Sequence, residues 1–355
     1  MDEANQLPPS RLEQLRTALA PGRRVLIVPH DFPDPDALAA AAAFHLLLDK
    51  HFGIQSQIAF SGEVSRAENK ELLRSLRCRW HRMAELRLRR DATHDCILVD
   101  TAPWSRNVTL PPSAKVCAVI DHHEYRTPSA IDGLYADIRH ESGATTTIAH
   151  EYLRAAGVDI PRWLASVMAY AIASETQDLS REVSRVDVGA YLDLVPLADL
   201  RVIGRIRHAP LSREYYVHLQ EALARARVWH DVVWTHLTDV AQPEIAAEVA
   251  DLLLRMDGVR WSFCIAELPG RLFISMRSRR RGAHCSRILR AAVGRQGVAG
   301  GHDQMAAGYL ATDGLAGLEL EERRLALVRQ MLRRMGYRPS TATESLDEQA
   351  RRLVE

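Results

Sequence analysis

Three short apolar runs, each followed at once by acidic or histidine side chains, constrain the fold more than any other feature of this sequence. They are VLIVP (25–29), CILV (96–99) and KVCAVI (115–120). Continuous apolar runs of this length are typical of strands buried on both faces of a parallel sheet. Strand and helix patterns alternate from residue 25 to about residue 180, which predicts a doubly wound α/β domain.

The pattern changes in the second half of the chain. Residues 187–228 are expected to be helical, and three further strands follow at 231–237, 259–268 and 271–277. Helical patterns at 243–255, 284–293 and 319–336 separate or follow them, which predicts a second, smaller α/β domain. The expected organisation is a first domain over 1–190, a helical linker over 191–228, a second domain over 229–337 and a polar tail over 338–355.

Composition excludes several classes of protein. The 355 residues carry a net charge of +1, so no global field draws the chain to nucleic acid or to a membrane. Five scattered cysteines without a C-x-x-C pair indicate a reducing compartment. The first residues contain early acids and no apolar segment typical of a secretory signal, and the longest apolar run, 37–48, is too short to span a bilayer. We therefore expect a cytoplasmic protein without membrane association.

The polar residues that follow the three apolar runs are suited to binding metal ions. Because the carboxyl ends of parallel strands meet at one edge of a sheet, we expect these side chains to gather there. The set comprises His30, Asp34, Asp36, Asp100, Asp121, His122 and His123. Carboxylate and imidazole ligands of this kind can hold a pair of divalent cations. Each residue alone has a structural explanation, since Asp36 or Asp100 could cap a helix. Helix capping is a poor explanation for ligand-type residues at three separate strand ends.

The same residues carry a resemblance to a known family. The motifs H-x-x-P-D-x-D (30–36), V-D-T (99–101) and D-H-H (121–123) resemble the DHH phosphoesterase superfamily. The segment GVAGGHDQMAAGYL (297–310), preceded by Arg277 and Ser278, is similar to the glycine-rich segment of the DHHA1 domain found in the nanoRNase and RecJ branches. The resemblance covers about residues 25–335. It implies a DHH domain and a DHHA1 domain with the active cleft between them.

The resemblance also implies a ligand set for two Mn²⁺ ions, with Mg²⁺ as the alternative. One ion would be held by His30 and Asp34, the other by Asp36 and His122, and Asp100 would bridge the two. His123 would lie toward the scissile phosphate, and Asp121 would orient the two histidines. Two cations held in this way can activate a water and offset the charge of the phosphoryl oxygens.

A fourth motif departs from the family pattern. Members often carry I-x-x-D-T, whereas this chain has Ile-Ala-Ser-Glu-Thr over residues 172–176. Glu175 would keep a carboxylate with a reach one methylene longer. Asp178 lies three residues on and is the alternative ligand, and an ordinary pair of acids at a helix end is the remaining interpretation. We favour Glu175.

The second domain is expected to hold the substrate. Arg277 would clamp a phosphate, with Ser278 beside it. Gly300 and Gly301 suit a close approach of the backbone to a phosphate, and His302 could donate to a phosphate oxygen. The six tryptophans show no repeated spacing that indicates base stacking, so most are expected in the core.

The sequence thus predicts a metal-dependent hydrolase of small nucleotides, such as very short RNA, linear or cyclic dinucleotides, or 3′-phosphoadenosine 5′-phosphate. Near-neutral charge fits short substrates better than long nucleic acid, which needs many cationic contacts. Short single-stranded DNA is a further candidate, and a homodimer is compatible with this prediction. Two other classes stay open, a non-catalytic nucleotide sensor on the same fold and an inorganic pyrophosphatase.

Overall fold

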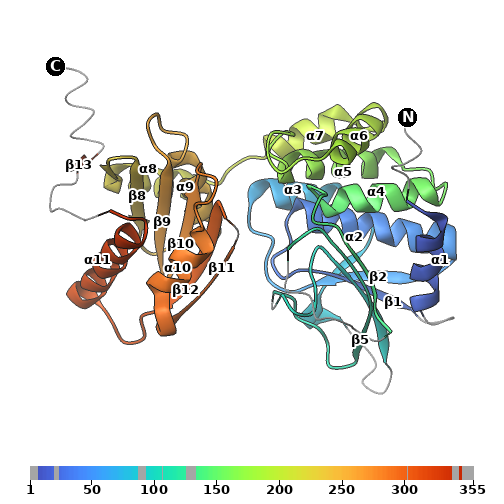
Figure 1. Cartoon of the computed structure of the whole chain (residues 1–355), viewed down its shortest axis with the longest axis horizontal. Helices are drawn as coiled ribbons and strands as arrows, with labels where there is room; N and C mark the ends of the chain where they lie inside the picture. Colours follow the sequence, from blue (N-terminus) through green and yellow to red (C-terminus); the bar gives the residue numbers. More distant parts are fainter. Residues whose placement is uncertain are drawn as a thin grey trace. The chain divides into compact units, whose positions relative to one another are not determined.

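The chain divides into two compact units, each with its own sheet (Figure 1). The computed structural model describes residues 7–19, 24–86, 93–105, 107–124, 133–301, 303–337 and 344–345. The units are Met1–Pro210 and Leu211–Glu355. The division therefore lies inside the range expected to be a linker, and the expected polar tail lies outside the described residues except for 344–345. Within the described residues, no helix combines the length and apolar character that crossing a bilayer requires.

The N-terminal unit is built on a six-stranded parallel sheet, which confirms the expected α/β class. The strand order is β3-β2-β1-β4-β5-β6, and every neighbouring pair is parallel. The strands are β1 (Val25–Pro29), β2 (Ser56–Phe60), β3 (Trp80–Arg82), β4 (His94–Val99), β5 (Ala114–Asp121) and β6 (Tyr135–Ile138). The chain reverses its direction of progress across the sheet between β1 and β4, and ligands of open α/β sheets bind at such a point.

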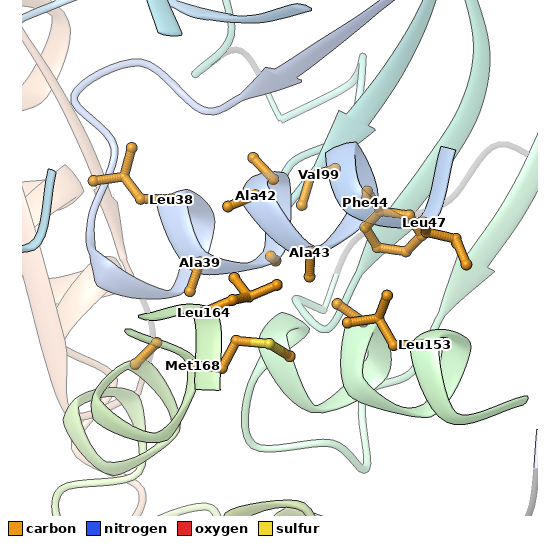
Figure 2. Close-up of a cluster of buried hydrophobic side chains, with 14 of the residues drawn as sticks. Leu38, Ala39, Ala42, Ala43, Phe44, Leu47, Val99, Leu153, Leu164 and Met168 are labelled. Atoms are coloured by element: carbon orange, nitrogen blue, oxygen red, sulfur yellow. The ribbon is translucent and has the colours of Figure 1, made fainter. Parts of the chain in front are cut away.

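Helices cover one face of this sheet. They are α1 (Pro9–Ala18), α2 (Pro35–Leu47), α3 (Ala67–Ser75), α4 (Thr145–Ala155), α5 (Arg162–Glu175), α6 (Arg185–Leu194) and α7 (Leu200–Arg207). Helix α2 is buried almost all round, as its alanine-rich sequence predicts. Figure 2 shows its small side chains Ala39 and Ala43 facing Leu153 of α4 and Leu164 and Met168 of α5. Small residues let these helices lie close to α2, and a larger side chain there would overpack the core.

The opposite face of the sheet is covered differently. In the described part of the chain, its apolar partners come from connecting segments and a short 3₁₀ turn rather than from α-helices. They include Met83, Leu86, Val108 and Leu110, which pack against Leu26, Val28 and Leu98. The strand order is that of a doubly wound domain, but the connection after β4 crosses this face as irregular chain. The turn-rich sequence WSRNVTLPPS (104–113) accounts for the missing helix.

The C-terminal unit holds a mixed sheet between two helical layers. Its strand order is β11-β12-β10-β9-β8-β7-β13, with β8 and β9 parallel and the other neighbours antiparallel. The strands are β7 (Arg227–Trp229), β8 (Val232–Leu237), β9 (Trp261–Leu268), β10 (Arg271–Ser278), β11 (Gly297–Gly301), β12 (Met305–Ala311) and β13 (Glu344–Ser345). Helices α10 (Cys285–Val293) and α11 (Gly317–Arg334) pack on one face, and α8 (Arg213–Arg225) and α9 (Glu244–Leu253) on the other.

The glycine-rich segment of this unit is not an open turn. Its residues form β11 and β12, which pair in antiparallel register. A Cβ at Gly301 would lie 2.3 Å from the carbonyl oxygen of Met305, and one at Gly308 would lie 2.6 Å from that of Val298. These two glycines therefore allow the close approach of the strands themselves, whereas a Cβ at Gly300 would meet nothing within 4 Å.

Candidate metal centre

Adjacent strand ends bring the predicted acids and histidines of the N-terminal unit together. Strand β1 ends one residue before His30, β4 ends one residue before Asp100, and β5 ends at Asp121. Because β1, β4 and β5 are neighbours in the sheet, these residues share its carboxyl edge. Two groups of side chains there place their ligand atoms within 4.8 Å of one another. The groups are His30, Asp34 and Asp100, and Asp100, His122 and His123.

Asp100 is the residue that both groups share. Its side chain is buried and accepts a hydrogen bond of 2.7 Å from the Thr145 hydroxyl. Its carboxylate oxygens lie 3.5 Å from His30 Nε2 and 3.6 Å from His122 Nε2. Its backbone is left-handed, with φ of 59°, a conformation that costs a non-glycine residue about 1 to 3 kcal/mol. The fold thus stores strain at the centre of the cluster.

His30 and Asp34 occupy the loop between β1 and α2. Nδ1 of His30 donates to the carbonyl oxygen of Asp31 at 2.9 Å, so in the neutral ring the lone pair is on Nε2, which faces Asp100 and Asp34. Nε2 lies 3.8 Å from Asp34 Oδ1. Asp34 is also the N-cap of α2, because Oδ1 accepts from the Ala37 N–H at 3.0 Å. The capping role considered for Asp36 therefore belongs to Asp34, with Pro35 in the first turn.

Asp36 is buried inside the domain rather than exposed at a helix end. Its two oxygens accept the backbone N–H groups of Thr145 and Thr146 at 2.7 and 2.8 Å. These are the first N–H groups of α4, which the helix itself leaves unsatisfied. Oδ2 lies 3.9 Å from His122 Nε2. The start of α4 thus fixes Asp36 directly and Asp100 through the Thr145 hydroxyl.

The two adjacent histidines after β5 are oriented by different groups. His122 donates from Nδ1 to the carbonyl oxygen of Ser142 at 3.1 Å. His123 Nδ1 lies 2.9 Å from Asp121 Oδ1, which also accepts the backbone N–H groups of both histidines. Asp121 therefore orients the His123 ring and the backbone of the pair, whereas Ser142 orients the His122 ring. Such orienting acceptors are typical of histidines that bind metal or substrate.

The electrostatics of the cluster show an excess of buried negative charge. Burial, with repulsion from Asp100, raises the pKa of Asp36 to about 7. Burial also raises the pKa of Asp100 to about 6, although nearby histidines oppose this shift. Burial disfavours protonation of His30 and His123, but their carboxylate partners outweigh it and raise the pKa to about 9 for His30 and about 10 for His123. Further positive charge would relieve this imbalance.

The donor set fits divalent cations. His122 Nε2 is buried and makes no hydrogen bond within the described part of the chain. Two atoms that each lie about 2.1 Å from one cation can be at most about 4.2 Å apart. The separations of 3.5 to 3.9 Å between histidine nitrogens and carboxylate oxygens meet that limit but are too long for good hydrogen bonds.

The two candidate acids of the fourth motif face different surroundings. Glu175 is the last residue of α5, and burial and the charges of Asp34, Asp36 and Asp100 raise its pKa well above the ordinary value. Its carboxyl therefore lies within electrostatic reach of the cluster. Asp178 is exposed and accepts a hydrogen bond of 2.8 Å from Arg207 of α7. Residues 177–179 are all left-handed, with φ between 48° and 61°, and this turn separates the two acids.

The residues expected to bind substrate lie in the C-terminal unit. Arg277 donates from Nε to Asp251 at 2.6 Å and from Nη1 to the Ser275 hydroxyl at 2.8 Å. Ser278 is buried and donates to the carbonyl oxygen of Arg260 at 3.1 Å. Gly300 lies in β11, and His302 lies outside the described residues. These contacts hold Arg277 at the end of β10 with a fixed guanidinium plane.

The residues that hold the ligands in place were not predicted from the sequence. Thr145 and Thr146 bind Asp36, Thr145 binds Asp100, and Ser142 orients His122. A signal existed in the run of three threonines at 145–147, because threonine is an unusual choice for the start of a buried helix unless its polar groups are used. Asp187 anchors the same segment by accepting from the Gly143 N–H and the Thr147 hydroxyl.

The sequence is similar to a family model and to two proteins from other organisms. Residues 24–172 match the family model described as DHH family, N-terminal domain. The chain is 27% identical over 315 residues to an uncharacterized protein of Methanocaldococcus jannaschii, covering 84% of this chain and 63% of that protein. It is 27% identical over 186 residues to a probable manganese-dependent inorganic pyrophosphatase of Enterococcus faecalis, covering 51% of this chain and 58% of that protein. The chain thus spans less than two thirds of either relative.

One solved structure has a similar fold along nearly the whole chain. It is an exopolyphosphatase-related protein from Bacteroides fragilis, with a TM-score of 0.68 and 14% identity. The alignment covers 92% of this chain and 97% of that protein. At this identity the likeness establishes the fold.

Proposed function

We propose that this chain is a divalent-metal-dependent phosphoesterase that hydrolyses small nucleotides, because residues 24–172 match the family model described as DHH family, N-terminal domain. The candidate substrates are very short RNA, linear or cyclic dinucleotides, and 3′-phosphoadenosine 5′-phosphate. One observation carries the proposal: buried Asp100 belongs to two groups of potential ligands, and His122 Nε2, which makes no hydrogen bond to any described residue, lies 3.6 Å from it. A structural network would have satisfied that nitrogen.

The proposed ligands divide between two ions. His30 and Asp34 would hold one, Asp36 and His122 the other, and Asp100 both, with Glu175 as the ligand from the fourth motif. The Enterococcus faecalis relative is named as manganese-dependent, which supports Mn²⁺, with Mg²⁺ as the alternative. When bound, such ions lower the pKa of a coordinated water and offset the charge of phosphoryl oxygens.

The remaining residues of the site would position the substrate. We assign His123 the role of donating to a phosphate oxygen, with Asp121 holding its ring through the 2.9 Å contact. In the C-terminal unit, Arg277 and Ser278 would bind a further phosphate, together with the backbone of Gly300 and Gly301 and the side chain of His302. The hydrogen bonds of Arg277 to Asp251 and Ser275 would lower the entropy lost on binding.

The test is hydrolysis by chain stripped with EDTA and then supplied with Mn²⁺. The panel should hold 3′-phosphoadenosine 5′-phosphate, two- to five-nucleotide RNA, a linear and a cyclic dinucleotide, a longer single-stranded DNA, and pyrophosphate. We expect Mn²⁺-dependent release from the short nucleotides, and its loss in Asp100→Asn. The matched control is Asp193→Asn, an exposed carboxylate of the same unit that pairs with Arg154.

Two alternatives predict different results in the same panel. An inorganic pyrophosphatase would cleave pyrophosphate and no nucleotide, and the match to the Enterococcus faecalis relative makes this the second candidate. A nucleotide sensor would bind nucleotide without turnover on any substrate.

A further inference from the structure

A cavity lies in the N-terminal unit beside β2, β3 and α3. Its volume is about 390 Å³, within the range of sites that bind small molecules. Phe60 lines it from the end of β2, Trp80 and Arg82 line it from β3, and Lys70 and Arg74 line it from α3. None of these residues belongs to the candidate metal centre, and the described lining contains three cations and no acid.

The aromatic part of the cavity is a fixed platform with an accessible surface. Trp80 stacks on Phe60 with a centroid distance of 5.5 Å and an interplanar angle of 21°. Phe60 is buried, whereas Trp80 is 36% exposed, so this tryptophan is not a core residue as most of the six were expected to be. An indole held on one side and open to solvent is suited to stack with a nucleobase, because every base offers a π-face.

The cations of the cavity are available for an anionic group. Arg74 contacts Glu71 at 3.4 Å and Arg82 contacts Glu63 at 3.4 Å, both at the long limit of a hydrogen bond. The two arginine side chains and Glu63 are largely exposed, and exposed ion pairs of this kind contribute little to stability. A phosphate could therefore replace Glu63 at small cost and gain charge-assisted hydrogen bonds.

The loops after β1 and β2 connect this cavity with the metal centre. Phe32 lies between His30 and Asp34, and its backbone N–H donates to the Ser61 carbonyl oxygen at 2.9 Å. Its ring is 56% exposed and sits against Gly62, where a Cβ would lie 2.7 Å away. Neighbouring strands are about 4.8 Å apart, so β2 and β3 lie two and three strands, about 10 to 15 Å, from β4, whose end carries Asp100. A dinucleotide is long enough to span that distance.

We propose that the cavity lined by Trp80, Phe60, Lys70, Arg74 and Arg82 binds a nucleoside monophosphate unit. The base stacks on Trp80, and the phosphate binds the three cations. The inference rests on the proposed function in one respect. If the chain is a phosphoesterase, the nucleoside monophosphate in this cavity is the nucleotide next to the one whose phosphate lies at the metals.

The test is calorimetric titration of the full chain in EDTA with AMP, inorganic phosphate, adenosine and a three-nucleotide RNA. We expect AMP and the RNA to bind more tightly than phosphate or adenosine, because both the base and the phosphate contribute to binding. Trp80→Leu should weaken AMP binding about tenfold, and Trp80→Phe should largely restore it, because stacking is worth that much per base. Arg82→Ala should weaken AMP and phosphate but leave adenosine unchanged.

The control is Arg154→Ala, an exposed arginine of the same unit that pairs with Asp193. AMP binding that is absent in the wild type, or equal in Trp80→Leu and the wild type, would overturn the proposal. A Trp80→Leu chain that fails to fold leaves Arg82→Ala to decide. Because the titration contains no metal and no turnover, a failed hydrolysis panel would refute the proposed function without touching this result.

Discussion

The N-terminal unit buries carboxylates at two places on one sheet, and the two places differ in how much positive charge offsets the carboxylates. Asp137 of β6 is buried, yet it contacts Arg11 and Arg139 and accepts a hydrogen bond of 2.8 Å from Tyr152. Burial would raise its pKa, but the hydrogen bond and charge of Arg139 outweigh burial and lower it. Around this carboxylate the protein itself supplies the compensating charge.

At the strand ends near Asp100, the buried carboxylates lack such arginine partners among the described residues. Asp36 and Asp100 are buried to the same degree as Asp137, but no arginine or lysine appears among the contacts described for them, and their pKa values are raised. The difference separates a carboxylate network whose charge arginines offset in full from one whose carboxylates are offset only in part, by histidines. It argues for cations more strongly than the presence of acids does, because buried acids also occur in structural networks.

The largest effect should come from Asp100. Asp100→Asn keeps the shape of the side chain but removes the charge shared by both ligand groups. We expect hydrolysis to fall more than about a thousandfold, beyond the loss typical for one electrostatic group. In EDTA the same variant should be at least as stable as the wild type in thermal unfolding, because it removes an uncompensated charge. A marked loss of stability in EDTA would contradict the comparison.

Asp137 should behave in the reverse way. Asp137→Asn leaves Arg11 and Arg139 without their buried partner, and breaking such a network costs about 3 to 5 kcal/mol of unfolding free energy. Urea unfolding measures this directly. Mn²⁺ affinity of the folded variant should stay that of the wild type, and a large drop in affinity would show that the two regions are coupled.

The pH dependence of stability should change sign when metal is added. The raised pKa values of Asp36 and Asp100 give the metal-free chain stability that is complete below about pH 4 and lost as the pH rises through about 6 to 7. The raised pKa values of His30 and His123 act in the same direction at higher pH. Since cations bind the deprotonated groups, Mn²⁺ should stabilise the chain more as the pH rises.

Thermal scans at about pH 5 and about pH 8, each with EDTA and with Mn²⁺, measure both trends. A metal-free chain that gains stability over this range would contradict the assigned carboxylate pKa shifts.

The smallest effects should distinguish the two acids of the fourth motif. Glu175→Gln should weaken Mn²⁺ binding about tenfold or more, because its carboxyl lies within reach of the cluster. Asp178→Asn should leave Mn²⁺ affinity unchanged and cost less than about 1 kcal/mol, since it breaks only an exposed pair with Arg207. Isothermal titration with Mn²⁺ measures the affinity of both variants. Equal losses of affinity would show that Asp178 is a ligand as well.

The strands that carry the metal-binding residues could be predicted because their signal is local. A continuous apolar run followed by an acid or a histidine marks both a buried parallel strand and its carboxyl end, and β1, β4 and β5 all have this form. Short or polar strands such as β3 and β6 give no such signal. Strands β11 and β12 were hidden by glycines, which weaken strand propensity and here serve the close approach of two backbones.

The partners of the ligands could not be predicted, because they are distant in sequence. Asp36 and Thr145 are separated by 109 residues, and no local pattern joins them. The left-handed backbone of Asp100 could not be predicted either, because aspartate adopts this conformation more often than most residues but only in a minority of cases. The sequence offered Asp36 as the cap of α2, but Asp34 caps it. The contact with α4 explains this, because Asp36 is bound to the Thr145 N–H inside the fold.

The start of α4 has one more consequence. Its first two N–H groups bind Asp36, and the Thr145 hydroxyl binds Asp100, so a brief opening of this single helical turn would release both carboxylates at once. Ions held by these carboxylates would resist that opening. Amide hydrogen exchange at Thr145 and Thr146 would then slow on addition of Mn²⁺, and two backbone protons would report ion occupancy without any substrate.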